Sequence, residues 1–255
     1  MESFFFGNSE RQLYGVFHAA SPEKYRGRAV LLLFPLGQEY MRIHRAFRRL
    51  ADLLAEQGFD VMRFDYACTG DSSGSFRDIT YDALNDSAEI AYDELKAMSP
   101  DAQVDVVALR LGTVVARQLA QNRKVRRLVL WEPYYSDGEF LQQWEVTMVE
   151  NGMTRANFID DNFLHFNGFA YGSTIRMSML LGNWSEFSAA AVSDLLVLST
   201  RDSSDFNEFK FAFGGATNLE IRSVDGPDDW AVVDSVGGLF LPEPSIVAIR
   251  EWLAA

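Results

Sequence analysis

Cysteine and histidine are both scarce in this 255-residue chain, which has one Cys and three His. The single Cys68 cannot form an intrachain disulfide or a cysteine metal cluster. The histidines, His18, His44 and His165, do not have the spacing of metal ligands. We therefore predict no metal site and no cofactor, in a chain suited to a reducing, cytoplasmic setting.

Basic residues are also few, because 23 Lys and Arg stand against 36 Asp and Glu and give a net charge of −13. This balance disfavours nucleic acid and anionic membrane surfaces as partners. No apolar run reaches the roughly 18 residues of a membrane span, and the first residues carry no basic or long apolar signal region. We expect an acidic, cytoplasmic protein of bacterial type without a membrane span, and we leave a homodimer open.

Short apolar runs alternate with amphipathic segments along most of the chain. Continuous apolar runs of this length are typical of strands covered on both faces, and repeated strand and helix units predict right-handed crossovers. The fold class is therefore α/β, a mostly parallel sheet of about eight strands with helices on both faces. The predicted strands are 4–6, 13–17, 29–34, 59–64, 104–109, 127–131, 195–199 and 219–222, and the main predicted helices start near 43, 81, 112, 204 and 245.

The alternation is interrupted between residues 134 and 187, where the chain is irregular and rich in aromatic residues and methionine. A structureless loop of that length would be unusual inside a compact domain. We predict one core domain, residues 1–133 and 188–255, with residues 134–187 inserted as a helical cap. The apolar side chains of the cap either pack onto the sheet or line a ligand cavity.

The chain is centred on the run from Val104 to Ala120. A β-branched strand ends at a sharp turn, Ala108-Leu-Arg110-Leu-Gly112, and a helical pattern follows at once. This is the context of a nucleophile elbow, whose usual form is Gly-x-Ser-x-Gly. Arg110 stands at the middle position, and a guanidinium that stays protonated can be neither nucleophile nor general base.

With these motifs the chain resembles the α/β-hydrolase superfamily over nearly its whole length. The resemblance is closer to hydrolase 2 of the exosortase A system, which also has Leu-Arg-Leu-Gly at the elbow. The superfamily resemblance rests on the segments 34–37, 65–74 and 108–112. The closer resemblance adds the segments 37–42, 131–133 and 166–171.

The superfamily triad follows the chain order Ser, acid, His. Arg110 replaces the serine, and the acid position after strand 195–199 matches Asp202. The histidine position falls in the segment 225–230, which contains Asp229 and Trp230 but no histidine. The resemblance therefore implies the fold and the place of the site, together with a degenerate triad and no ordinary serine-hydrolase chemistry.

Two interpretations of Arg110 stay open. It could receive an anion beside the backbone N–H groups of Leu111 and of the Leu36 loop. It could equally fill the former nucleophile position in a buried ion pair, since a buried charge needs a partner with or without a ligand. The candidate partners are Glu39, Glu132, Asp202 and Asp229.

The candidate catalytic residues are Arg110, Asp202, Asp229, Glu132 and His44. The candidate ligand-binding residues are Leu36, Gly37, Glu39, Leu111, His165 and Trp230. His44 could act as an acid or base at the start of its helix, or it could face solvent. His165 could reach over Arg110, or it could only pack within the cap. Cys68 lies in a loop where a small residue suits a turn, and nothing nearby in sequence would activate it.

Three classes of function are compatible with this pattern. The first is an enzyme that uses chemistry other than the triad on an acyl or carboxylate-bearing small molecule, in an accessory or biosynthetic pathway. The second is a catalytically inactive pseudo-hydrolase that binds a ligand or a partner. The third is an esterase or thioesterase with a replacement nucleophile. The expected ligand is a small molecule, apolar with one anionic end.

Overall fold

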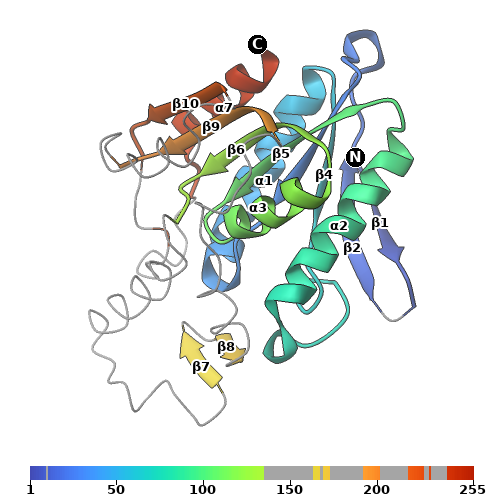
Figure 1. The fold of residues 1–255 in the computed structure, drawn as a ribbon, viewed down its shortest axis with the longest axis vertical. Coiled ribbons are helices and arrows are strands. Elements are labelled where there is room, and N and C mark those ends of the chain that lie inside the picture. The colour runs from blue at the N-terminus through green and yellow to red at the C-terminus, as the bar shows by residue number, and fades with distance from the viewer. Residues whose placement is uncertain are drawn as a thin grey trace.

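The computed structural model describes residues 1–9, 11–134, 163–166, 169–172, 192–201, 218–226, 230 and 240–255. Within these residues most of the chain forms one twisted sheet with helices against it (Figure 1).

The main sheet has eight strands in the order β1-β2-β4-β3-β5-β6-β9-β10. Strands β1 and β2 form an antiparallel hairpin that pairs antiparallel with β4, and every other pairing is parallel. This confirms the predicted α/β class and the eight-stranded, mostly parallel sheet. The strand bounds are β1 Glu2–Gly7, β2 Gln12–His18, β3 Arg28–Leu33, β4 Phe59–Phe64, β5 Gln103–Leu109, β6 Val125–Trp131, β9 Val192–Ser199 and β10 Asn218–Ser223.

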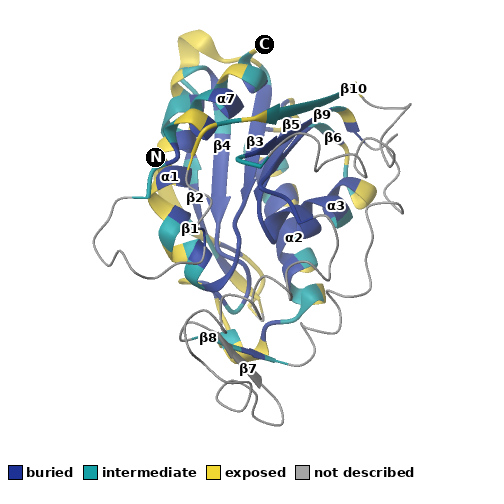
Figure 2. Cartoon of the chain, turned by 90° about the vertical axis from the view of Figure 1, so that its left-hand side faces the viewer, coloured by how far each residue is buried: buried dark blue, intermediate teal, exposed yellow. Residues whose placement is uncertain are grey.

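Helices cover both faces of the sheet. Helices α1 (Gly37–Glu56) and α7 (Glu243–Ala254) contact each other on one face, and α2 (Tyr81–Met98) and α3 (Gly112–Asn122) contact each other on the opposite face (Figure 2). Two short 3₁₀ helices lie in loops, η1 (Pro22–Lys24) between β2 and β3 and η2 (Phe76–Asp78) between β4 and α2. All six residues of the central strand β3 are buried, as its continuous apolar run requires.

Helix α1 starts earlier than the sequence pattern indicates. The prediction placed its start near Ile43, where the apolar period becomes regular, whereas the helix begins at Gly37. The first turn is polar and follows Pro35, so periodicity alone could not detect it. Because α1 begins at Gly37, Glu39 lies in its first turn, where the N-terminal end of the helix dipole favours a carboxylate.

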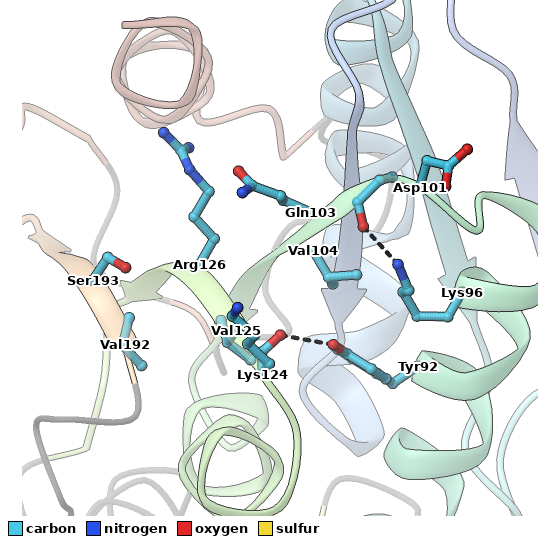
Figure 3. Close-up of a pocket in the computed structure, with 11 residues that line it drawn as sticks. Tyr92, Lys96, Asp101, Gln103, Val104, Lys124, Val125, Arg126, Val192 and Ser193 are labelled. Carbon is cyan, nitrogen blue, oxygen red and sulfur yellow. Dashed lines mark hydrogen bonds between the residues drawn. The ribbon is translucent and has the colours of Figure 1, made fainter.

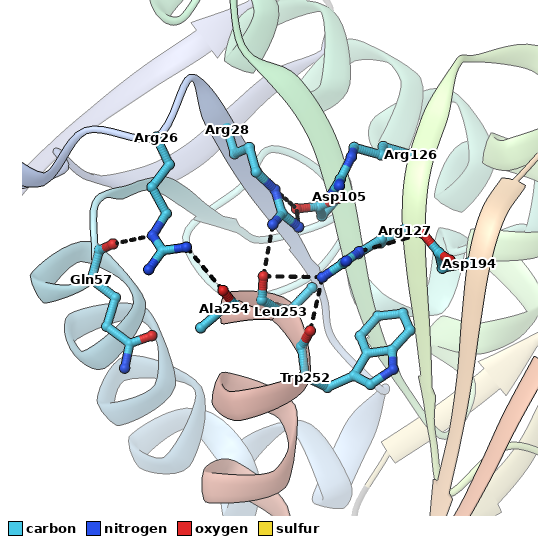
Figure 4. A network of polar contacts seen from close by, with 10 residues as sticks. All are labelled: Arg26, Arg28, Gln57, Asp105, Arg126, Arg127, Asp194, Trp252, Leu253 and Ala254. Atoms are coloured by element: carbon cyan, nitrogen blue, oxygen red, sulfur yellow. Dashed lines mark hydrogen bonds and ion pairs between the residues drawn. The ribbon is translucent and has the colours of Figure 1, made fainter. Parts of the chain in front are cut away.

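Near the amino ends of β3 and β6, arginine side chains bond to the last turn of α7 (Figure 4). Arg28 Nη1 donates to the carbonyl of Leu253 at 2.7 Å, and Arg127 Nη1 donates to that of Trp252 at 2.8 Å. Arg28 also pairs through Nε with the fully buried Asp105 at 2.9 Å. These bonds satisfy carbonyls that a helix C-terminus leaves without partners and fasten α7 to the sheet.

The predicted cap, residues 134–187, lies mostly outside the described residues. Apart from Tyr134, its described part is a two-stranded hairpin of β7 (Phe163–Phe166) and β8 (Phe169–Gly172), and β8 contacts η2. The division into core and cap stays a prediction. The helix predicted from residue 204 lies outside the described residues as well. None of the described helices has the length and hydropathy that crossing a membrane would require.

Candidate functional site

The candidate site is at the carboxyl edge of the sheet, where β3 and β5 end side by side in parallel register. The turn after β5 places Arg110 in the left-handed region with φ +52°, and its N–H donates to the carbonyl of Trp131 at 3.0 Å. A Cβ on Gly112 would lie 2.5 Å from the carbonyl oxygen of Leu33, so only glycine lets α3 begin this close to β3. The turn has the strand, strained residue and helix arrangement of a nucleophile elbow.

Arg110 is held in place by Glu39. Its Nε and Nη2 both lie 3.1 Å from Oε1 of Glu39, and both side chains are less than 10% exposed, at 8% and 6%. The guanidinium also lies over the ring of Tyr134, 4.3 Å from the ring centroid. The Tyr134 hydroxyl donates to the same Oε1 at 3.4 Å. Of the four carboxylates named as partners, Glu39 therefore makes the described ion pair.

The electrostatics of the pair keep Arg110 charged. Burial alone would lower the pKa of the guanidinium, but the Glu39 carboxylate and Tyr134 outweigh this effect and raise the pKa above its ordinary value. An arginine at this turn is consequently a fixed cation at any working pH. It can orient a ligand or polarise a carbonyl, but it cannot take up a proton.

Two backbone donors flank this pair. Leu36 precedes α1 and Leu111 precedes α3, so both residues stand at the ends of neighbouring strands. Neither backbone N–H donates a hydrogen bond within the described part of the chain, although the two residues are 5% and 2% exposed. A buried N–H without a partner is costly. In enzymes that have a nucleophile elbow, the N–H of the residue after the nucleophile and an N–H from the loop after β3 bind the carbonyl oxygen of the substrate.

Tyr171 of β8 packs over the start of α1. A Cβ on Gly37, where φ is +61°, would lie 2.0 Å from the Tyr171 hydroxyl, so the position requires glycine. Phe76 of η2 contacts the Tyr171 ring, with centroids 4.9 Å apart. Burial, and then the Glu39 carboxylate, raise the pKa of Tyr171, which keeps this phenol neutral beside the pair.

Glu132, a predicted catalytic residue and candidate partner of Arg110, lies at the end of β6 and bonds to the turn after β9. It is 2% exposed, has φ +46°, and accepts hydrogen bonds from the Ser199 hydroxyl at 2.7 Å and from the backbone N–H of Thr200. No hydrogen bond or ion pair joins Glu132 to Arg110 among the described contacts, but the charge of Glu132 adds to the effects that raise the pKa of Arg110. Glu132 instead fixes the turn after β9, the segment that leads to residue 202.

His44 and Trp230 have no described contact to Arg110. The ring of His44 is exposed and stacks on Phe34, with centroids 6.1 Å apart. Desolvation on its inner side, and then the charge of Arg63, lower the pKa of His44. Trp230 is 4% exposed and packs edge-on against Trp131 at 5.7 Å.

Three candidates cannot be placed at side-chain level. Asp202 and Asp229 lie outside the described residues. His165 belongs to β7, where its backbone pairs with Ala170, and its side chain is not described. No group of three His, Cys, Asp or Glu in the described ranges is arranged to hold a metal ion.

Sequence reasoning missed two aromatic residues of the site, Tyr134 and Tyr171. Tyr134 directly follows the Trp-Glu-Pro segment, so its place at the end of β6 was available from sequence, but its contact with Arg110 was not. Tyr171 was counted among the cap aromatics. It reaches α1 only because the β7 and β8 hairpin folds back onto η2.

The loop after β4 is also ordered around a carboxylate. Asp65, 7% exposed, accepts hydrogen bonds from the Tyr40 hydroxyl at 2.7 Å and from the backbone N–H of Asp71 at 3.0 Å. Burial raises the pKa of Asp65, although these bonds oppose that shift. In the same loop burial raises the pKa of the Cys68 thiol, which disfavours a nucleophilic thiolate.

A hollow of about 790 Å³ lies at the amino ends of the parallel strands (Figure 3). Lys96, Lys124 and Arg126 line it, but Lys96 already donates to the carbonyls of Pro100 and Ala102. It lies at the amino ends of β5, β6 and β9, away from the carboxyl edge where open α/β sheets bind ligands. We therefore place the candidate site at Arg110.

The sheet order, the helices on both faces and the strained turn between β5 and α3 define the α/β-hydrolase fold. Solved structures of the same fold cover almost the whole chain. Est1E of Butyrivibrio proteoclasticus, with ferulic acid bound, is 13% identical with a TM-score of 0.73, over 98% of this chain and 97% of its own. An esterase of Pyrococcus furiosus is 14% identical with a TM-score of 0.65, over 99% and 89% of the two chains.

A third structure, an alpha-beta serine hydrolase homologue from Coxiella burnetii, is 13% identical with a TM-score of 0.58, over 99% and 95% of the two chains. No family model matches the sequence. No curated protein matches it either. Identities this low show the shared fold and leave the activity to be argued from the site.

Proposed function

We propose that this chain is an enzyme of α/β-hydrolase fold that acts on an acyl or carboxylate-bearing small molecule by chemistry other than the serine triad. In this proposal the N–H groups of Leu36 and Leu111 bind the carbonyl or carboxylate oxygen. Arg110 supplies a fixed positive charge beside them. The closer resemblance to hydrolase 2 of the exosortase A system is part of the same proposal.

One observation carries the proposal: the elbow geometry is kept although its residue is an arginine. A left-handed residue with a side chain stores about 1–3 kcal/mol of strain and persists where the surroundings require it. Arg110 retains that conformation, and the two N–H groups beside it are without acceptors among the described residues. These are the parts of the site that bind a developing negative charge.

A second candidate function is a ligand-binding or partner-binding pseudo-hydrolase. The observation that favours it is the buried pair itself, because Glu39 neutralises Arg110 without any ligand. The two candidates differ in turnover. We would incubate the protein with small carboxylic acids and thioesters in D₂O and follow them by NMR, since proton abstraction or acyl transfer changes the spectrum and binding alone does not.

The direct test of the site is ligand titration of Arg110→Ala and Arg110→Lys. The first probes would be aryl and alkyl carboxylic acids, including ferulic acid, which is bound in one structure of this fold. We expect Arg110→Lys to keep the charge but lose the planar, two-point contact, so that binding weakens about tenfold or more while the fold survives. Arg110→Ala should weaken binding further.

The matched control is Arg123→Lys, which changes another ion-paired arginine, here with Asp93 on the surface, in the same way. Thermal melts on all variants would separate loss of binding from loss of folding. Equal dissociation constants for the wild type, Arg110→Lys and Arg110→Ala would eliminate the proposed receptor.

A further inference from the structure

The hydrogen bonds to Glu39 are distributed unevenly over its carboxylate. Oε1 is contacted by three donors, which are Arg110 Nε at 3.1 Å, Arg110 Nη2 at 3.1 Å and the Tyr134 hydroxyl at 3.4 Å. Among the residues that the structure describes, no hydrogen bond to Oε2 is found. Each carboxylate oxygen can accept two hydrogen bonds, so Oε2 retains the capacity to accept one from a ligand.

This acceptor is held in a fixed place. Glu39 is 5% exposed, it belongs to the first turn of α1, and its other oxygen is bound by a guanidinium that is itself packed on Tyr134. Leu36 lies three residues before Glu39, and Leu111 directly follows Arg110. The Glu39–Arg110 pair and the two backbone N–H groups therefore belong to the same two helix starts, at adjoining strand ends.

We propose that Oε2 of Glu39 accepts a hydrogen bond from the ligand, and so selects acyl groups or carboxylates that carry a hydroxyl or amine donor close to the carbonyl carbon. This inference rests on the proposed function, because it needs the ligand oxygen to sit on the N–H groups of Leu36 and Leu111. It adds a specificity-determining residue and a substrate class, 2-hydroxy or 2-amino acyl compounds.

The selection follows from the donor and acceptor inventory. An ionised carboxylate oxygen only accepts, so a ligand ether or fluorine in the same place would face it without a proton. A hydrogen bond to a charged group contributes about 1.5–3 kcal/mol, which corresponds to a preference of about tenfold or more for the hydroxyl compound. A site built on such a bond rejects analogues that lack the donor, because its own polar group is then left unpaired.

Glu39→Gln gives a sharp prediction because the arginine fixes the orientation of the new amide. The guanidinium has only donors, so the glutamine carbonyl must turn toward Arg110 and its NH₂ group must take the place of Oε2. An acceptor is thereby replaced by a donor at one point, with almost no change of volume. The preference for a hydroxyl over a methoxy group should then disappear, since both oxygens can accept from the amide.

The experiment compares 2-hydroxy-3-phenylpropanoate, 2-methoxy-3-phenylpropanoate and 2-fluoro-3-phenylpropanoate, the last as the size control for the hydroxyl. Dissociation constants would be measured by ligand-observed NMR titration on the wild type, on Glu39→Gln and on Glu251→Gln. Glu251 is a surface carboxylate, 62% exposed, on α7 and gives the same charge change elsewhere. We expect the hydroxy acid to bind about tenfold more tightly than the other two in the wild type and in Glu251→Gln, and about equally in Glu39→Gln.

The outcomes separate the two proposals. Binding of none of the acids at millimolar concentration overturns the proposed function and this inference with it. Equal binding of all three acids to the wild type, or a hydroxyl preference that survives in Glu39→Gln, overturns this inference alone. The wild-type comparison does not depend on the folding of any variant, so the inference stays testable even if Glu39→Gln unfolds.

Discussion

A buried arginine and glutamate lie at the carboxyl edge of this sheet. Arg110 and Glu39 are both withdrawn from water, and taking two charges out of water is costly unless each satisfies the other. Tyr134 covers the guanidinium and donates to the same carboxylate oxygen. The buried pair is therefore a unit in which each charge stabilises the other.

The first prediction concerns the coupling within this unit. Arg110→Ala leaves Glu39 buried without its counter-ion and should lower the free energy of unfolding by about 3–5 kcal/mol. Glu39→Ala removes the described ion-pair partner of Arg110 and should be destabilising as well, by less because Arg110 has further contacts. The double variant Arg110→Ala/Glu39→Ala removes both charges and should lose much less than the sum. Urea unfolding at pH 7 measures all three, and additive losses would contradict the pairing.

The second prediction concerns how His18 makes the free energy of unfolding depend on pH. It is 2% exposed, its Nδ1 lies 2.8 Å from Oδ1 of Asp52, and Arg63 Nε donates to its Nε2 at 3.1 Å. Nε2 must then be an acceptor, which fixes the neutral tautomer with the proton on Nδ1. Burial, and then the charge of Arg63, lower the pKa of His18, while Asp52 partly opposes them.

The lowered pKa of His18 in the folded chain sets the sign of the pH dependence of stability. Below about pH 6.5 the unfolded chain protonates this histidine while the folded chain does not, so the free energy of unfolding falls as the pH falls. The loss is at most about 1.4 kcal/mol per pH unit for this single group. Chemical unfolding between pH 7 and pH 5 should give a smaller slope for His18→Asn than for the wild type. Identical slopes would show that His18 does not titrate as argued.

At the scale of elements, the site depends on how closely α3 approaches β3. Gly112 is helical and makes this approach possible, because a Cβ there would meet the carbonyl oxygens of Leu33 at 2.5 Å and Phe34 at 2.8 Å. Backbone cannot move aside as a flexible side chain can. The separation of the two elements therefore also sets where Leu36 and Leu111 lie relative to each other.

The third prediction compares two glycine substitutions. Gly112→Ala should destabilise the protein by about 3 kcal/mol, in the range of overpacked core sites, because α3 must move away from β3. Gly27→Ala is the matched control, since its Cβ would meet nothing within 4 Å and only its φ of +66° is unfavourable. That variant should lose about 1 kcal/mol. Thermal and urea unfolding of both variants test the difference, and equal losses would show that close packing at Gly112 is not limiting.

At the scale of the whole molecule, the topology brings Arg110, Glu39 and two backbone donors together while it keeps the described histidines elsewhere. His18 belongs to the network with Asp52 and Arg63, and His44 stacks on Phe34. Neither is hydrogen-bonded to a serine in the described part of the chain. In the proposed function this arrangement binds a carbonyl oxygen, and no serine hydroxyl paired with a histidine is found in the described part of the chain.

The fourth prediction is that serine-hydrolase chemistry is absent from the whole protein. A nucleophile and its base act as a unit, so a site without both should retain only the acceleration from binding and from the backbone donors. Short-chain nitrophenyl esters should turn over near the background rate, and a fluorophosphonate probe should leave the intact mass unchanged. Arg110→Ser should gain little, since no base is supplied with the hydroxyl. A stoichiometric adduct on one serine, with turnover lost when that serine is replaced, would contradict the prediction.

Some elements of this fold could be predicted from the sequence and others could not. The apolar runs at 29–34 and 104–109 predicted the two central strands, because a strand buried on both faces has a local, continuous signature. The turn at Arg110 was predicted in the same way, from a small set of adjacent residues. The start of α1 was predicted six residues late, since its first turn has no apolar face.

The sequence by itself determined the α/β class, the order of strands and helices, and the presence of an arginine where a nucleophile would stand. All of these follow from patterns within a few consecutive residues. Only the tertiary structure decided that Arg110 pairs with Glu39, 71 residues away, and that Glu132 instead fixes the turn after β9. A buried charge must find a partner, but which carboxylate it reaches depends on how α1 and α3 pack against the sheet, and no local pattern encodes that distance.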